Sequence, residues 1–252
     1  MLCLEHAGFC YTNGKIAKEV FSNISFCINE GEIVSVVGRN GCGKTTLLRV
    51  LAGFLELTSG RMTMGYGKKS KKLSIGWVPQ FPVLMPNKTI KQNIILPIEC
   101  AGQKVGDKFV AKMIDKYGLR EYIDFFPHQV SGGTKQKASI VRALITSPQL
   151  LLMDEPFFSI DAYTREIMNV DLAKSLRSEK VTTILVTHSL EEAVFLSDRV
   201  FVMSSFSSSL PSTIIKEVEI NLSSRRGFQV KSDPSFVKIV DEVRRYLYGN
   251  TL

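Results

Sequence analysis

The chain has 252 residues, of which 44% are hydrophobic and 22% charged, and it carries a formal net charge of +8 at pH 7. This composition is ordinary for a globular protein, and the length allows one large domain or one domain with an inserted lobe. No apolar run approaches the ~20 residues that cross a bilayer, and the first residues lack the basic-then-apolar layout of a secretion signal. We therefore expect neither a membrane span nor a secretion signal.

The cysteine spacing and the distribution of basic residues argue against a cysteine metal or redox site and against a nucleic-acid partner. Five cysteines, at positions 3, 10, 27, 42 and 100, form no C-x-x-C pair. The sequence therefore predicts free thiols in a reducing cytosol rather than a metal or redox site. The densest basic run, KKSKK at residues 68–72, has no interleaved aromatic residues of the kind that stack on bases. We interpret this run as the solvated tip of a hairpin, and we expect no nucleic-acid partner.

The first part of the chain predicts a strand pair, a buried strand and a helix. Residues 2–10 and 20–28 are apolar-rich and flank the turn residues 12–15, a pattern typical of antiparallel strands. Tyr11 closes the first strand, where its ring either packs at the strand end or stacks on an adenine. The β-branched run 33–37 predicts a buried strand, and a helix starting near Lys44 follows, with apolar residues at helical spacing up to Leu55.

Between that strand and that helix lies GRNGCGKT, residues 38–45, a full match to G-x-x-x-x-G-K-[ST]. Its glycines allow backbone N–H groups to turn inward and form a concave anion site, to which the helix adds its positive end. Lys44 supplies a charge for the β- and γ-phosphates, and the Thr45 hydroxyl is placed to ligate Mg²⁺. A chance glycine turn is the alternative, but it does not require this strand–loop–helix context.

In the middle of the chain the pattern changes from strands to helices. Residues 58–60 predict a turn, 61–64 and 73–79 short strands, and 81–87, with two prolines, a connector. No strong strand pattern occurs from residue 87 to 149, and helices are predicted over 89–101, 107–117, 119–126 and 131–146. We interpret this region as a helical lobe inserted into a sheet domain.

The last part returns to alternating strands and helices. Strands are predicted over 150–153, 181–187, 199–204 and 212–220, the last two around a serine-rich turn at 204–209, and helices over 162–180, 190–196 and 233–248. The final helix has Asp233 or Ser232 as its cap and Pro234 at its first position. We expect no internal repeat and no disordered tail.

Two acids follow the strand at 150–153. Asp154 is placed to hold Mg²⁺ directly or through water, and Glu155 to polarise an attacking water as general base. Adjacent acids after a strand are not rare, and they indicate a nucleotide site here because a phosphate loop precedes them.

A second glycine motif opens the helix at 131–146. Ser131, Gly132 and Gly133 free backbone N–H groups at a helix N-terminus, which makes either a second anion site or an ordinary N-cap. One chain does not need two γ-phosphate sites, whereas two chains facing each other can each complete the other's site.

These motifs, in this order, resemble the ATP-binding-cassette ATPases over essentially the whole chain. The resemblance rests on Tyr11 as the adenine-stacking aromatic, residues 38–45 as the phosphate loop, Gln80 as the hinge glutamine, Val130 to Thr134 as the signature, Leu150 to Glu155 as the magnesium strand, Asp161 in the following loop and His188 as the switch histidine. From the residues alone, a capping or core histidine is the favoured interpretation of His188.

The resemblance implies an α/β fold: a P-loop NTPase (RecA-like) core with an antiparallel β subdomain and an inserted α-helical subdomain. It implies the segments 1–86 and 150–224 as the nucleotide-binding core, 87–149 as the helical subdomain and 225–252 as a helical tail. It also implies a head-to-tail dimer, a homodimer by expectation, with two ATP molecules between the protomers.

The implied site residues follow from the same motifs. Catalytic roles fall to Lys44, Gln80, Glu155 and His188, and Mg²⁺ ligation to Thr45, Gln80 and Asp154. The implied ATP contacts are Tyr11, Gly38, Arg39, Asn40, Gly41, Cys42, Gly43, Lys44, Thr45, Thr46 and Asp161, with Ser131, Gly132 and Gly133 supplied by the other chain.

The chain departs from the family pattern at a few positions. Val130 and Thr134 replace the outer residues of the usual Leu-Ser-Gly-Gly-Gln signature, but the Ser-Gly-Gly core is intact, so we expect an active site. Phe158 replaces a small residue near the dimer seam, where it is expected to alter packing or rate. Cys42 lies inside the phosphate loop and is a candidate point of thiol inhibition.

The segments HSLEEA at 188–193 and LSDRV at 196–200, with the compact tail, look like importer ATPases of the nitrate/sulfonate/taurine group. That resemblance implies membrane permease subunits and an extracytoplasmic solute-binding protein as partners, and a place at the cytoplasmic face of the membrane. The candidates for permease docking are the apolar residues of the connector, which could equally serve simple lobe packing: Phe81, Val83, Leu84 and Met85. An exporter or lipid-transport ATPase is the nearest alternative. A soluble chromosome or repair ATPase is disfavoured because residues 87–149 show no sustained heptads, and a translation-type protein because that class usually carries two cassettes per chain whereas this chain has one.

Overall fold

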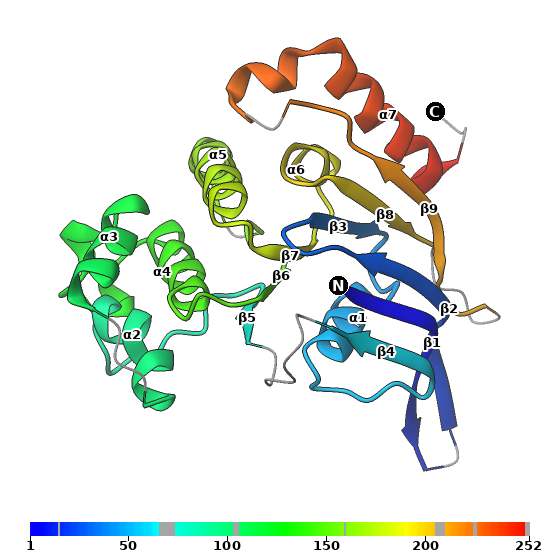
Figure 1. Ribbon diagram of the computed structural model, residues 1–252, viewed down its shortest axis with the longest axis horizontal. Coiled ribbons are helices and arrows are strands. Elements are labelled where there is room, and N and C mark those ends of the chain that lie inside the picture. The colour runs from blue at the N-terminus through cyan, green and yellow to red at the C-terminus, as the bar shows by residue number, and fades with distance from the viewer. Residues whose placement is uncertain are drawn as a thin grey trace.

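The computed structural model describes residues 1–14, 16–65, 74–102, 106–158, 160–204, 210–223 and 226–249. Two sheets organise these residues: a three-stranded sheet in the order β2-β1-β4 and a six-stranded sheet in the order β5-β6-β7-β3-β8-β9. Helices cover both faces of the larger sheet, and a separate group of helices extends from one end of it (Figure 1). The predicted α/β class is confirmed.

The larger sheet is parallel except at one edge. Its strands are β3 (Ile33–Gly38), β5 (Ile75–Val78), β6 (Leu150–Asp154), β7 (Thr182–Val186), β8 (Arg199–Met203) and β9 (Ile214–Glu219), and only β9 runs antiparallel to its neighbour. Every residue of β3, β6 and β7 is buried, as expected for central strands covered on both faces. Their carboxyl ends therefore meet at one edge, where open α/β sheets bind ligands.

The smaller sheet is antiparallel and consists of β1 (Leu2–Asn13), β2 (Ile16–Ile28) and β4 (Ser59–Met64). Its apolar face, with Phe21 and Ile24, packs in one cluster with Val34 and Val36 of β3 and with the buried side of α1 (Lys44–Leu51). The phosphate-loop helix is thereby held between the two sheets.

The remaining helices form two groups. The helices α5 (Ala162–Glu179), α6 (Leu190–Leu196) and α7 (Pro234–Tyr248) lie on the face of the large sheet opposite α1 (Figure 1). The helices α2 (Ile90–Cys100), α3 (Asp107–Lys116) and α4 (Gly132–Leu144) form the lobe at the end of the sheet. Local chemistry starts α2, because Thr89 and Gln92 exchange side-chain and backbone hydrogen bonds in a capping box. None of the helices in the described ranges is both long and apolar enough to cross a membrane.

The helix predicted over 119–126 is wrong. Within that range the chain forms only one short 3-10 turn, Arg120–Tyr122, and a second one, Pro127–Gln129, follows it. The carbonyl oxygens of Ile123 and Phe125 accept hydrogen bonds from the N–H groups of Lys91 and Ile90, the first residues of α2. These carbonyl oxygens pair with the N–H groups at the start of α2, which have no partner within their own helix, and are therefore not used to continue a helix over 119–126.

The prediction of five free thiols is also wrong. Cys3 and Cys27 form a disulfide, and Cys10, Cys42 and Cys100 are free. The register of the β1–β2 pair places Cys3 directly opposite Cys27, a neighbour relation that the sequence spacing of 24 residues does not reveal. The basic run 68–72, the serine-rich turn at 205–209 and Arg225 lie outside the described residues.

Candidate active site

The phosphate loop joins β3 to α1 in a conformation that requires glycine. Gly43 caps α1 with φ 96°, and a Cβ there would lie 2.6 Å from Val20 Cγ1. A Cβ on Gly38 would lie 2.6 Å from the sulfur of Cys42. Glycine at both positions is therefore a steric requirement of this loop and not a chance of composition.

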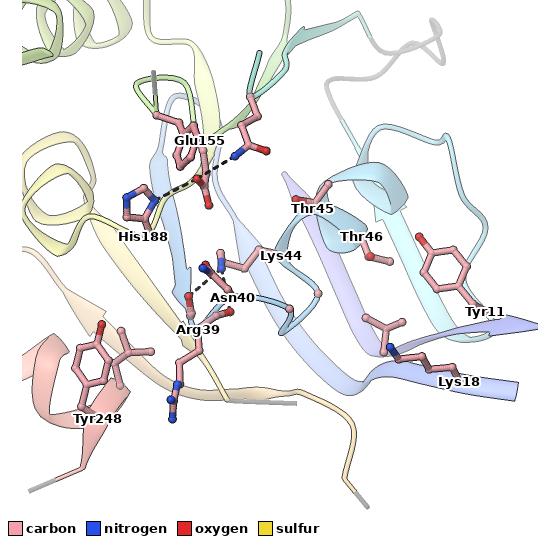
Figure 2. Close-up of a pocket in the computed structure, with 17 residues that line it drawn as sticks. Tyr11, Lys18, Arg39, Asn40, Lys44, Thr45, Thr46, Glu155, His188 and Tyr248 are labelled. Atoms are coloured by element: carbon pink, nitrogen blue, oxygen red, sulfur yellow. Dashed lines mark hydrogen bonds and ion pairs between the residues drawn. The ribbon is translucent and has the colours of Figure 1, made fainter. Parts of the chain in front are cut away.

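Lys44 opens α1 and is only 6% exposed. Its Nζ donates to the carbonyl oxygens of Gly38 at 2.8 Å and Arg39 at 3.2 Å, so the loop itself holds the ammonium group in place (Figure 2). The loop lines a cleft of about 920 Å³ together with Gln80, Glu155 and His188. A fixed cation at the N-terminus of a helix that follows a glycine-rich loop is suited to bind a polyphosphate.

Thr45 and Asp154 form the next layer of the site. The Thr45 hydroxyl donates to Asp154 Oδ1 at 3.2 Å, across the ends of α1 and β6. Burial raises the pKa of the Asp154 carboxyl above its ordinary value, and the Thr45 hydrogen bond partly opposes that shift. A hydroxyl and a carboxylate are hard oxygen donors that suit Mg²⁺.

The residues present fit a magnesium ion that completes its shell from outside the protein. The described residues contain no cluster of three or more His, Cys, Asp or Glu side chains arranged to hold a metal by themselves. Mg²⁺ commonly binds through one or two protein oxygens plus substrate phosphates and water, and the Thr45–Asp154 pair meets that requirement.

Glu155 lines the same cleft as the phosphate loop. Its side chain is 14% exposed, and Oε2 accepts a hydrogen bond from Gln80 Nε2 at 3.4 Å and lies 3.1 Å from His188 Nδ1. Its backbone has φ 45°, an uncommon value for a residue other than glycine, and its N–H is tied to the carbonyl oxygen of Val186 at 2.8 Å. Such strain is typical of sites where a side chain must be aimed precisely by its surroundings.

The hydrogen-bond network that supports His188 has no signature in the sequence. The Thr187 hydroxyl donates to Glu192 Oε2 at 2.8 Å and accepts from the Ser189 N–H at 3.0 Å. Burial raises the pKa of the Glu192 carboxyl. The Thr187 hydrogen bond and the positive charge of the nearby Arg165 partly offset this rise. This network fixes the turn between β7 and α6 and so the position of the histidine. The segment reads as an ordinary helix start, which hid its role.

The outer wall of the cleft contains one predicted and several unpredicted residues. Tyr11 lies there with 42% of its surface exposed, and its ring contacts Phe9 edge-on at 4.8 Å. Lys18, which is paired with Tyr11 across β1 and β2, lines the same wall. A hairpin register with its turn at Gly14 would have revealed this pairing.

Leu247 and Tyr248, at the end of α7, also line the cleft, and Tyr248 lies across it from Tyr11, near Arg39 (Figure 2). No local pattern signals their position, because it depends on how the C-terminal helix packs back on α6 and the sheet.

The signature residues lie elsewhere. Ser131, Gly132, Gly133 and Thr134 line a second cleft of about 490 Å³, and Asp161 lies there with them rather than beside Lys44. Ser131 caps α4 by accepting the Thr134 N–H at 3.1 Å, and Asp161 caps α5 by accepting the Thr164 N–H at 3.0 Å. The hydrogen bonds to Thr164 hold the pKa of Asp161 below its ordinary value. The structure thus separates the predicted contacts into two clefts on one chain.

Cys42 does not face the first cleft. Its side chain is fully buried in the apolar cluster under the small sheet, and burial raises the pKa of its thiol. We expect iodoacetamide to alkylate the exposed Cys100 first at pH 7–8, and to reach Cys42 only after unfolding or at higher pH, because the thiolate is the reactive form. Mass spectrometry of peptides from native and unfolded protein measures this order. Fast labelling of native Cys42 would contradict its buried placement.

The comparisons with known proteins agree with this geometry. Residues 21–158 match the ABC transporter family. An ABC transporter ATP-binding protein of Methanocaldococcus jannaschii is 39% identical over 213 residues, 83% of this chain and 78% of that protein. The nitrate import ATP-binding protein of Synechocystis sp. is 36% identical, covering 90% and 87% of the two chains. The taurine import ATP-binding protein of Rhizobium johnstonii is 34% identical, covering 99% and 97%.

Among solved structures, a dimeric ATP-binding cassette in a post-hydrolysis state with ADP and Pi superimposes with a TM-score of 0.75. The sequences are 24% identical, and the match covers 88% of this chain and all of that one. This likeness supports the fold. ATP binding and hydrolysis are supported by the family match together with the intact phosphate loop. The chain belongs to the ABC transporter family, and it is the kind of family member that binds and hydrolyses ATP.

Proposed function

We propose that this ATPase drives a binding-protein-dependent membrane importer of a small anion such as nitrate, a sulfonate or taurine. The observation that carries the proposal is that relatives named for nitrate and taurine import match at least 87% of both chains. The chain works at the cytoplasmic face of the membrane as a peripheral subunit. Its partners are membrane permease subunits and an extracytoplasmic solute-binding protein.

We infer the roles at the nucleotide from the first cleft. Tyr11 stacks on the adenine, and the loop residues Gly38 to Thr46 surround the phosphates through their N–H groups and Lys44. Thr45, Asp154 and Gln80 hold Mg²⁺, which neutralises phosphate charge when bound. Glu155 takes the proton of the attacking water, and His188, within hydrogen-bonding distance of it, helps hold that water in line.

The second cleft supports the proposed head-to-tail homodimer. Ser131, Gly132 and Gly133 present a helix N-terminus, which can bind an anion, in a cleft separate from the one that Lys44 lines. In a dimer the signature of one chain faces the phosphate loop of the other, and Asp161 lies at that seam. ATP then binds between the chains, so that its binding closes the dimer and its hydrolysis reopens it.

We infer that the permease contacts the connector between Gln80 and α2. Phe81, Val83 and Met85 are 57%, 67% and 50% exposed, which leaves an apolar surface beside the helical lobe. The proposed units, 1–86 and 150–224 for the core, 87–149 for the helical lobe and 225–252 for the tail, place this surface at the junction of core and lobe.

Copurification from the native membrane tests the proposal. A tagged chain is expected to bring down a multi-span membrane protein and an extracytoplasmic solute-binding protein, whose ligand then identifies the solute. Membranes prepared with a Phe81→Asp/Val83→Asp variant serve as control, because two charges on the connector would weaken an apolar contact. A multi-span partner without a binding protein would favour export or lipid traffic, and recovery with DNA or ribosomes would contradict transport.

A further inference from the structure

Phe158 is an exposed aromatic residue inside the nucleotide cleft. It follows Glu155 by one tight turn, in which the Phe158 N–H donates to the Glu155 carbonyl oxygen at 3.1 Å. Its ring is 48% exposed and lines the cleft, whereas the neighbouring Phe157 is buried and anchors the turn in the core. A large apolar side chain kept in a polar cleft is costly in water unless it contacts other groups there.

The Phe158 ring contacts His188 on one side. The two ring centroids are 5.9 Å apart at an interplanar angle of 76°, an edge-to-face arrangement. The His188 side chain is 49% exposed, and in the described part of the chain its only hydrogen-bonding partner is the Glu155 carboxylate. Phe158 therefore supplies a second restraint on a half-exposed ring that the carboxylate alone leaves free to pivot.

On the other side, the Phe158 ring contacts Phe81. These centroids are 6.0 Å apart at 85°, again edge-to-face. Phe81 begins the connector that leads from β5 to the helical lobe. A continuous row of side chains, Phe81, Phe158, His188 and Glu155, thus runs from the exposed connector into the cleft.

The connector itself is fastened to the helical lobe. Arg142 of α4 donates to the Val83 carbonyl oxygen at 2.6 Å, and the buried Asn93 of α2 bonds the backbone N–H and C=O of Met85 at 2.7 and 3.1 Å. Because these bonds tie the connector to α2 and α4, a displacement of the lobe relative to the sheet moves Phe81 relative to Phe158.

We propose that Phe158 is a positioning residue that couples the orientation of His188 to the position of the connector through Phe81. The ring does not touch the reacting atoms, and it acts by holding the imidazole against Glu155. This inference rests on the proposed roles of Glu155 and His188 in hydrolysis.

ATP turnover by the full-length chain tests the inference. Phe158→Ala is expected to lower kcat about three- to tenfold, the value of one aromatic edge-to-face contact, while leaving the KM for ATP nearly unchanged. Phe158→Tyr, which keeps the ring, restores kcat, and Phe158→Leu, which keeps only apolar bulk, does not. Phe81→Ala lowers kcat in the same direction, and the double variant is no worse than Phe158→Ala alone, because both changes break one chain of contacts.

NMR of the histidine rings gives a readout independent of activity. The chain has three histidines, and the signal lost in His188→Asn assigns the one in the cleft. Phe158→Ala is expected to shift the His188 signal and leave His128 unchanged. Phe126→Ala is the matched control, because Phe126 stacks on His128 at 5.9 Å outside the cleft, and it should shift only the His128 signal.

The outcomes separate this inference from the proposed function. If Phe158→Ala keeps the wild-type kcat and an unshifted His188 signal while Glu155→Gln is inactive, the inference about Phe158 is overturned. The proposed function is unaffected by that outcome. Wild-type turnover in Glu155→Gln would instead overturn the proposed role of Glu155 as general base, on which the inference rests. If Phe158→Ala fails to fold, Phe158→Leu and Phe158→Tyr are compared instead. Equal kcat values in these two variants would show that the aromatic ring is not required and would overturn the inference.

Discussion

Glu155→Gln is expected to lower kcat for ATP hydrolysis at least about a hundredfold, because general-base catalysis contributes roughly 10²–10⁴-fold to such reactions. The amide keeps the shape of the carboxylate and still accepts a hydrogen bond from Gln80, so the fold of the cleft is retained. It does not accept a proton from water at neutral pH. ATP affinity should remain within the range of the wild type, and the ATP-bound dimer should persist because the bound nucleotide is not consumed.

Phosphate release measures turnover in this experiment, calorimetry measures ATP affinity, and light scattering coupled to size exclusion measures the dimer. Glu191→Gln is the matched control: it removes the same charge from an exposed position at the start of α6 and should leave turnover unchanged. Substantial hydrolysis by Glu155→Gln would show that another group takes the proton. Loss of ATP binding would show instead that the carboxylate holds the nucleotide rather than the water.

Most elements with a strong local signal could be predicted from the sequence. The buried apolar runs became β3, β6 and β7, and the segment 190–196 became α6 without a change in its bounds. The end of α1 was placed too late, since the helix stops at Leu51 and Gly53 reverses the chain with φ 75°. Apolar residues at helical spacing continue to Leu55 because they pack on the same cluster after the helix has ended.

The first cleft was predictable because parallel strands share a direction. Residues that follow β3, β5, β6 and β7 must gather at one edge of the sheet, so Lys44, Gln80, Glu155 and His188 line one cleft although they are far apart in sequence. What could not be predicted depends on register or on long-range packing. The Cys3–Cys27 disulfide needs the exact β1–β2 register, and the place of Tyr248 needs the path of α7.

Lys44→Ala is expected to weaken ATP binding about 10- to 100-fold, because a hydrogen bond to a charged group is worth about 1.5–3 kcal/mol. The Lys44 ammonium is the buried cation of the phosphate loop, held by the carbonyl oxygens of Gly38 and Arg39. Its loss removes positive charge from the place where the β- and γ-phosphates are proposed to lie. AMP, which lacks those phosphates, should bind the variant and the wild type with similar affinity.

Competition against a fluorescent ATP analogue measures both affinities, and the rise in Tm on adding ATP reports the same loss, since a ligand stabilises only the state that it binds. Lys174→Ala, at an exposed position on α5, removes the same charge away from the cleft and should change neither value. The unfolding midpoint without nucleotide shows whether the loop survives, because alanine leaves two carbonyl oxygens without their donor. Equal losses of ATP and AMP binding with a lowered midpoint would assign Lys44 to holding the loop. A loss confined to ATP would assign it to the phosphates.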